Sequence, residues 1–282
     1  MLHDIKRMED SKFYMSPGQR ENFAISSVEF MHAGHIPGAV SILVESRGRR
    51  LLYTGDIKFI DTQLMRGANI SKEVDILISE STYSYTNHPD RKELEKRLRE
   101  IVSETVDNGG IAVVPAFAVG RTQEMLLLLS DLNAPIYLDG MGIRATESIL
   151  KYPDTIRNAK KLKDAFSRAI KIRRQRERER IIEKPGIIIT TAGMLNGGPV
   201  VYYIESLYKR EECSLILTGF QVPGTAGREL LDTGIFRNNG IEIKPEMRIE
   251  FLDFSAHTDH DHLLEFYNRL NPEKIEIVHV DH

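Results

Sequence analysis

Residues 111–132, Ile-Ala-Val-Val-Pro-Ala-Phe-Ala-Val-Gly-Arg-Thr-Gln-Glu-Met-Leu-Leu-Leu-Leu-Ser-Asp-Leu, combine an apolar strand, a turn and an apolar helix. A short apolar run that ends at Pro115 is typical of a buried strand, and Gly120 to Leu132 has the length of a helix. The alternation continues, with elements expected at 135–138, 144–152, 186–191, 200–208, 214–219 and 227–232. It predicts a parallel, Rossmann-like sheet covered by helices.

The segments before and after this block have a different pattern. Strands are expected at 23–31, 40–45, 50–54 and 75–79, with a tight turn at 46–48, followed by an amphipathic helix at 91–107. Strands at 249–254 and 275–280 flank a helix at 259–270. We interpret these last elements as a return of the chain to the unit formed by the strands before the α/β block. The α/β block is then an insertion, and the predicted domains are residues 1–85, 86–246 and 247–282.

Composition limits the classes of protein. The 282 residues carry a formal net charge of -3, which provides no overall attraction to nucleic acid, although residues 160–184 hold 11 Lys/Arg against 4 Asp/Glu. The single cysteine, Cys213, excludes an internal disulfide framework and fits a reducing compartment. Without an apolar run long enough to span a bilayer, and without a signal peptide, we expect a cytoplasmic protein that does not contact a membrane.

Several residues suit a metal or acid–base site. His35 follows a glycine and Asp56 ends an apolar strand, which fits either metal ligation or a buried histidine–carboxylate pair. Glu80 ends a buried strand, where it either caps a turn or faces a ligand crevice. In the run from His257 to His262 we favour His257 alone, because His260 and His262 are expected on a solvated helix surface.

Two glycine-rich turns, 190–199 and 219–227, each lie between a strand and a helix. Such turns expose backbone N–H groups, and Arg121 and Arg228 are near them, so the sequence predicts phosphate binding there. The expected contacts are Arg121, Thr191, Ala192, Gly193, Gly224, Thr225 and Arg228. The Arg/Glu alternation at 173–180 is expected to be a solvent-exposed helix, with contact to a polynucleotide as the alternative.

Eight motifs together resemble the β-CASP branch of the metallo-β-lactamase superfamily, and most closely the archaeal homologues of the cleavage and polyadenylation specificity factor nuclease subunit. They occur in the family's order and cover nearly the whole chain, at residues 32–39, 53–56, 80–83, 115–124, 192–199, 218–225, 254–259 and 278–279. The resemblance implies a metallo-β-lactamase αββα sandwich with an inserted β-CASP domain, and RNA bound in the cleft between them.

The resemblance also implies roles for single residues. His35, Asp56 and His279 match zinc ligands, with Asp56 between two zinc ions, while Glu80 and His257 match the acidic residue and the histidine of two further motifs. The implied activity is hydrolysis of RNA phosphodiester bonds, in which His257 protonates the leaving oxygen and Glu80 orients its imidazole. The resemblance leaves endonuclease and exonuclease action open.

The chain departs from the family pattern in one respect. The family's His-x-His-x-Asp-His motif is absent from the 34 residues before His35, and neither His3-Asp4 nor His32 substitutes for it. We therefore expect a partial sandwich that holds two zinc ions poorly by itself, is inactive alone, and is completed by a longer form, a complementing chain or a homo-oligomer. The alternative is a non-catalytic RNA-binding or scaffolding homologue. A small-molecule hydrolase of the lactamase fold is a third, weaker hypothesis.

Overall fold

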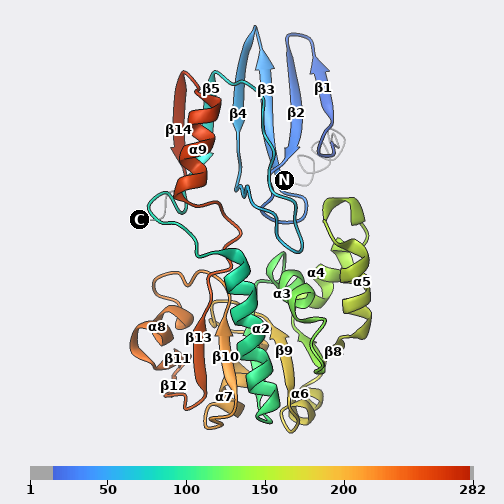
Figure 1. Ribbon diagram of the computed structural model, residues 1–282, viewed down its shortest axis with the longest axis vertical. Coiled ribbons are helices and arrows are strands. Elements are labelled where there is room, and N and C mark those ends of the chain that lie inside the picture. Colours follow the sequence, from blue (N-terminus) through green and yellow to red (C-terminus); the bar gives the residue numbers. More distant parts are fainter. Residues whose placement is uncertain (1–14, 280–282) are drawn as a thin grey trace, which may run out of the picture.

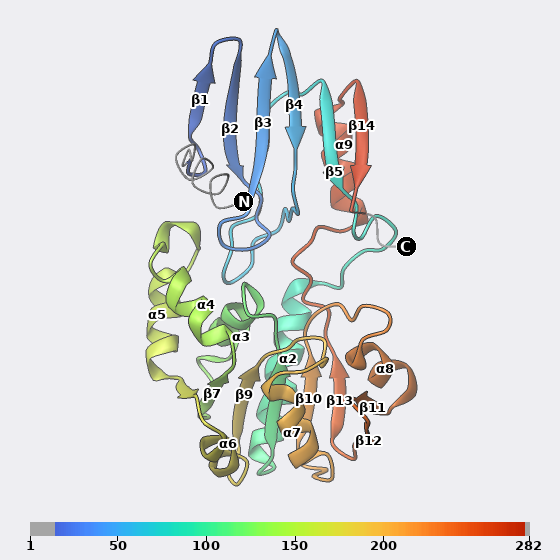
Figure 2. The same ribbon diagram turned by 180° about the vertical axis from the view of Figure 1, so that it is seen from behind.

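The computed structural model describes residues 15–279, and in this part of the chain the protein forms two lobes, each built on its own six-stranded sheet. Figures 1 and 2 show the lobes end to end, with two segments of chain running between them. The predicted α/β class is confirmed. Residues 1–14 and Val280, which fall in the predicted first domain and last strand, lie outside the described residues.

The first lobe is a mixed sheet with one helix packed on it. Its sheet order is β1-β2-β3-β4-β5-β14, antiparallel from β1 to β4 and parallel from β4 to β14. Its elements are β1 Arg20–Phe23, β2 Ser26–His32, β3 Val40–Ser46, β4 Arg49–Tyr53, β5 Ile76–Glu80, α9 His260–Leu270 and β14 Lys274–Val278. The segment predicted as one strand at 23–31 is instead a hairpin, because the chain turns at Ala24 and Ile25.

The core of this lobe lies between the sheet and α9. Leu43, Leu52 and Leu77 from three neighbouring strands are buried against Phe266 and Leu270 of the helix. The apolar side chains of this helix therefore face the sheet. This sheet and α9 are the part of the expected partial αββα sandwich that the described residues form.

The second lobe is a parallel sheet with helices on both faces, as predicted. Its order is β13-β10-β6-β9-β7-β8. Its elements are α2 Arg91–Asp107, β6 Ile111–Pro115, α3 Arg121–Leu129, β7 Ile136–Asp139, α4 Gly142–Ile149, a 3-10 turn Pro153–Thr155, α5 Ala159–Arg168, β8 Ile170–Ile172, α6 Gln175–Ile181, β9 Gly186–Thr190, α7 Pro199–Leu207, β10 Ser214–Leu217, α8 Ala226–Thr233, the hairpin β11 Phe236–Asn238 and β12 Ile241–Ile243, and β13 Arg248–Phe251.

The alternation of side chains along β6 and β9 builds a core on each face. Ala112, Val114, Ile187 and Ile189 pack with α2, α3 and α5. Ile111, Val113 and Ile188 point to the other face and pack with α7 and α8. Successive side chains of a strand point to opposite faces, so a continuous apolar run is what a sheet buried on both sides requires.

The strand predicted at 249–254 was assigned to the wrong lobe. It forms β13 and pairs in parallel with β10, from Ser214 with Arg248 to Leu217 with Phe251, so it is an edge of the second sheet. The chain returns to the first lobe only after Phe251. None of the helices between residues 15 and 279 is long and apolar enough to cross a membrane.

A buried ion pair fixes α6 to the end of β7. Arg178 lies 2.6 and 3.0 Å from the two carboxylate oxygens of Asp139, which also accepts a 2.7 Å hydrogen bond from the hydroxyl of Tyr203. The side chain of Asp139 is 1% exposed. The predicted solvated helix therefore carries one arginine that is structural.

We predict that Arg178→Met lowers the free energy of unfolding by roughly 3 kcal/mol, because it leaves the buried carboxylate of Asp139 without a counter-ion. Urea denaturation followed by circular dichroism measures this change. Arg176→Met on the exposed face of the same helix is the control and should change stability by less than about 0.5 kcal/mol. Equal stability of the two variants would contradict the structural role of Arg178.

Candidate metal centre and cavity

Three predicted site residues lie together because they follow neighbouring parallel strands. Asp56 comes shortly after β4, Glu80 is the last residue of β5, and His279 directly follows β14. The register pairs Tyr53 with Ile78 and Val278 with Glu80, so the three strands end side by side. Side chains at the carboxyl ends of parallel strands meet at one edge of a sheet, which is where ligands bind in open α/β sheets.

Asp56 has a histidine on each side. Its Oδ1 lies 2.9 Å from Nδ1 of His279, and its Oδ2 lies 3.7 Å from Nε2 of His35. Two ligands of one tetrahedral zinc ion are about 3.3 Å apart, from metal–ligand bonds of about 2.0–2.1 Å. His35 Nδ1 lies 3.0 Å from the backbone oxygen of Ala256, to which it donates as an N–H, and this leaves Nε2 free to ligate. Burial, followed by the nearby His257, lowers the pKa of His35 and favours the neutral form that binds metals.

Glu80 is buried, and both of its carboxylate oxygens accept hydrogen bonds. Its two oxygens accept hydrogen bonds from the backbone N–H of Ile57 at 2.6 Å, from the hydroxyl of Thr82 at 2.5 Å and from Nδ1 of His257 at 2.9 Å. Burial alone would raise the pKa of Glu80, but the hydrogen bonds from His257, Thr82 and Ile57 outweigh it and hold the pKa below its usual value. Glu80 thus acts here as a fixed carboxylate that orients an imidazole.

His257 lies beside the other two histidines of the site. Its ring centroid is 4.5 Å from that of His35 and 5.5 Å from that of His279. One nitrogen each from His257 and His279 and one oxygen each from Asp56 and Glu80 lie within 4.8 Å of one another. Since Nδ1 of His257 is bonded to Glu80, its Nε2 is the atom available for proton transfer. The five residues at 35, 56, 80, 257 and 279 therefore share one site, which fits a divalent metal with an adjacent acid–base histidine.

The other two histidines of the run have structural contacts. Nδ1 of His260 lies 2.5 Å from the backbone oxygen of Ser84, and Nδ1 of His262 lies 2.5 Å from Asp259, the N-cap of α9. His260 is half-buried rather than solvated, which differs from the prediction. Neither belongs to the metal-ligand group that the described residues form.

The site opens into a cavity of about 390 Å³ between the lobes, lined by His35, His257 and His279 on one side and by the loops of the second lobe on the other. Lys58 and Arg121 also line it, and both are buried. Burial, with the charges of Arg91 and its neighbours, lowers the pKa of Lys58 to about 7 and that of Arg121 to about 10. Within residues 15–279 neither has a carboxylate within 4.0 Å, so both are placed to receive an anion.

Sequence reasoning missed Lys58 and Thr82, which hold the His257 segment in place. Lys58 Nζ donates to the backbone oxygen of His257 at 3.0 Å, and Thr82 Oγ1 donates to Glu80. Lys58 lies two residues after Asp56, and Thr82 lies two residues after Glu80. Their closeness in the sequence to two predicted site residues was the signal that could have indicated them. Nothing in their local pattern indicates burial.

Of the seven predicted phosphate contacts, only Arg121 lines this cavity; Thr191, Ala192, Gly193, Gly224, Thr225 and Arg228 do not. The premise of free amides at the turn before α8 was wrong. Ala226 N–H donates to Asn196, Gly227 N–H to Met194, and Arg228 N–H to the Thr225 hydroxyl. At Ala226 and Gly227 the two glycine-rich turns bond to each other, so these amides are not donors for an anion.

The premise was also wrong before α7. That helix begins with Pro199, which has no N–H, and the amide of Val200 donates to the backbone oxygen of Thr191. The exposed guanidinium of Arg228 lies 2.9 Å from Asp232 on the same helix. Six of the seven contacts therefore stay predictions without support from the geometry.

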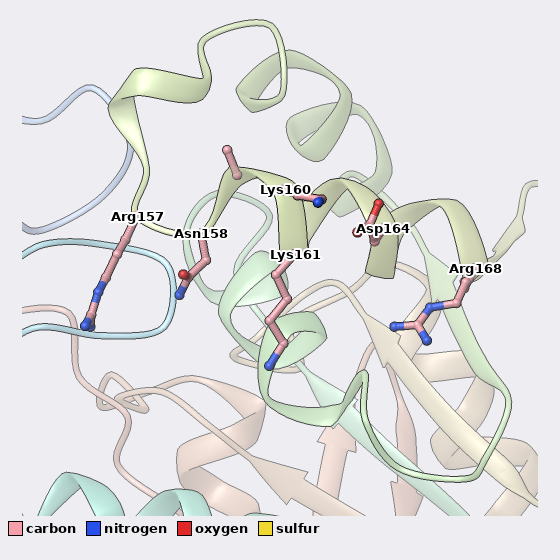
Figure 3. Close-up of a pocket in the computed structure, with 7 residues that line it drawn as sticks. Arg157, Asn158, Lys160, Lys161, Asp164 and Arg168 are labelled. Carbon is pink, nitrogen blue, oxygen red and sulfur yellow. The ribbon is translucent and has the colours of Figure 1, made fainter.

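A second hollow, of about 440 Å³, lies along α5 at the start of the basic segment, and Figure 3 shows Arg157, Lys160, Lys161 and Arg168 around it. Arg157 lies 3.2 Å from Asp61 and Lys161 lies 3.1 Å from Asp131. Arg168 donates to the backbone oxygen of Ser130 at 3.4 Å. Three of these four basic side chains already contact a carboxylate or a backbone oxygen, so the hollow is a weaker candidate for an anion-binding site than the cavity between the lobes.

Comparison with known proteins agrees with this geometry. The Beta-Casp domain profile matches residues 122–230, and the profile of the Zn-dependent metallo-hydrolase RNA specificity domain matches residues 241–282. The chain is 39% identical to the probable RNase MJ4 of Methanocaldococcus jannaschii, over 98% of this chain and 67% of that protein. It is 36% identical to RNase aCSPSF2 of Saccharolobus solfataricus, over 98% of this chain and 57% of that protein.

A third relative is named for a different role. The transcription termination factor FttA of Methanocaldococcus jannaschii is 35% identical, over 88% of this chain and 44% of that protein. The chain thus spans between 44% and 67% of the length of these three relatives. Together with the convergent histidines and carboxylates, these matches establish that the chain belongs to the β-CASP branch of the metallo-β-lactamase superfamily, with relatives named as ribonucleases and as a transcription termination factor.

Proposed function

We propose that this protein is the catalytic part of a zinc-dependent ribonuclease that hydrolyses phosphodiester bonds during RNA processing, such as the maturation of 3′ ends. The observation that carries the proposal is the Glu80–His257 pair beside Asp56, His35 and His279, in a cavity lined by the buried basic side chains Lys58 and Arg121. The similarity to the probable RNase and to RNase aCSPSF2 supports RNA as the substrate.

Each group has a distinct role in this proposal. Asp56, His35 and His279 would hold zinc, which when bound activates water near neutral pH and neutralises charge on phosphate oxygens. His257 donates a proton from Nε2 to the leaving oxygen, while Glu80 keeps the imidazole oriented and stabilises its charged form. Arg121 and Lys58 attract the phosphate into the cavity.

Asp56 with His35 and His279 beside it makes three candidate ligands, the number that a zinc ion with an open position takes, and we propose that they hold one ion. A second ion needs further ligands, and we propose that a longer form of the chain or a second polypeptide supplies them. Full activity would then depend on that addition. A homo-oligomer is the other arrangement that would bring extra ligands to the site.

We predict that the chain, stripped with a chelator and titrated with zinc chloride, binds one ion per chain. Asp56→Asn should weaken this binding roughly 100-fold or more, because it removes the carboxylate between the two histidines. Isothermal titration calorimetry and elemental analysis measure affinity and content. Asp61→Asn, an exposed aspartate of the following loop, is the matched control. Unchanged zinc binding by Asp56→Asn would exclude the proposed ligand set.

We predict that His257→Ala lowers the rate of RNA cleavage by roughly 10²–10⁴-fold with zinc present, the range for loss of a general acid. His262→Ala, in the same segment but bonded only to Asp259, should keep the rate of the unmodified chain. A gel assay on end-labelled RNA measures both variants, in this chain and in any longer form encoded in frame upstream of Met1.

Two results would overturn the proposal. Cleavage that survives His257→Ala would remove the acid from the mechanism. Well-folded protein that binds RNA but contains no zinc and cleaves nothing, in either form, would favour the alternative, a non-catalytic RNA-binding member of the family.

A further inference from the structure

Loops of the second lobe bring apolar side chains to the cavity, beside Arg121 of the same lobe. Phe117 and Val119 come from the loop between β6 and α3, and Phe220 and Val222 come from the loop between β10 and α8. Phe117 is 39%, Val119 43% and Val222 40% exposed. Exposed apolar side chains gathered beside a polar centre indicate a ligand that has an apolar part next to its charged part.

Phe117 is held in place by the backbone on which it packs. A Cβ on Gly219 would lie 2.9 Å from Cε2 of Phe117, and a Cβ on Gly193 would lie 3.5 Å from its Cδ1. The ring therefore lies directly against two glycines from two different loops. These contacts restrict the ring, and its remaining surface lines the cavity that also contains His35 and His257. A fixed aromatic ring loses little entropy when a flat ligand stacks on it.

We propose that Phe117 is the stacking platform for the nucleobase on one side of the cleaved phosphate, so that the substrate is unpaired at that position. This inference rests on the proposed ribonuclease function. A nucleotide combines a flat apolar base with a phosphate, which matches a cavity lined both by these apolar side chains and by Arg121, Lys58, His35 and His279. A base within a duplex has both faces stacked and does not reach such a cavity.

The test separates base stacking from a general contribution of Phe117 to folding. An oligoribonucleotide with one mapped cleavage site is compared with two versions that are abasic at the nucleotide before or after it. Dissociation constants are measured by fluorescence anisotropy in a His257→Ala background, so that cleavage does not interfere. Phe117→Ala, Phe117→Tyr and Phe251→Ala are compared in that background. Phe251 is a control because it is also exposed, on β13, but does not line the cavity.

Stacking on an aromatic residue contributes about 1–3 kcal/mol per base, so Phe117→Ala should weaken binding of intact RNA about 5- to 150-fold. One of the two abasic substrates should bind more weakly than intact RNA by the same factor when Phe117 is present. Phe117→Ala should not weaken the binding of that substrate any further. Phe117→Tyr should restore tight binding, and Phe251→Ala should leave it unchanged.

The inference would be overturned if the loss of affinity from Phe117→Ala multiplied with the loss from each of the two abasic substitutions. Phe117 would then act on something other than a base. Tight binding of intact RNA by Phe117→Ala would overturn it as well. Failure of the proposed function has a different signature: cleavage that survives His257→Ala appears as shortened RNA on a gel, and the binding cycle is then measured with the metal removed by a chelator. A chain that binds no RNA would overturn both.

Discussion

The contact between Glu80 and His257 is the constraint on which the rest of the site depends, because it joins the two segments that run between the lobes (Figure 1). Glu80 ends β5, just before the chain leaves the first lobe, and His257 lies where the chain returns. A carboxylate that is 1% exposed needs donors, and it takes them from Ile57, Thr82 and His257. Removing any donor would leave a buried charge partly unsatisfied, so the fold and the orientation of the imidazole are stabilised together.

Much of the site was predictable because it lies at strand ends. An apolar strand followed by a carboxylate or a histidine can be recognised in the sequence. Parallel strands of one sheet place such residues at the same edge, as they do with Asp56, Glu80 and His279. The motif order then added His35 and His257, which local pattern alone left ambiguous. The convergence of all five residues is therefore a consequence of topology, which the resemblance to the family had implied.

The predictions that were wrong concern features set by residues distant in the sequence, which a local sequence pattern does not contain. The strand Arg248–Phe251 has a periodicity that suits either lobe, and only its pairing with β10 assigns it to the second. The glycine-rich turns looked open because their own residues are small. In the fold the amides of Ala226 and Gly227 are satisfied by the neighbouring loop, through Asn196 and Met194. Hydrogen bonds between segments distant in sequence decide whether a turn can bind an anion.

The buried cations connect the stability of the protein with the chemistry of its ligand. Burial lowers the pKa of Lys58 to about 7 and that of Arg121 to about 10, which means that the charged form of each side chain has a desolvation cost in the free protein. Lys58 recovers part of that cost by donating to the backbone of His257, and Arg121 by donating to Thr218. A phosphate in the cavity would offset the remainder. Because an anion would stabilise the arrangement that also holds His257, the proposed binding of a substrate phosphate and the orientation of the His257 imidazole would reinforce each other.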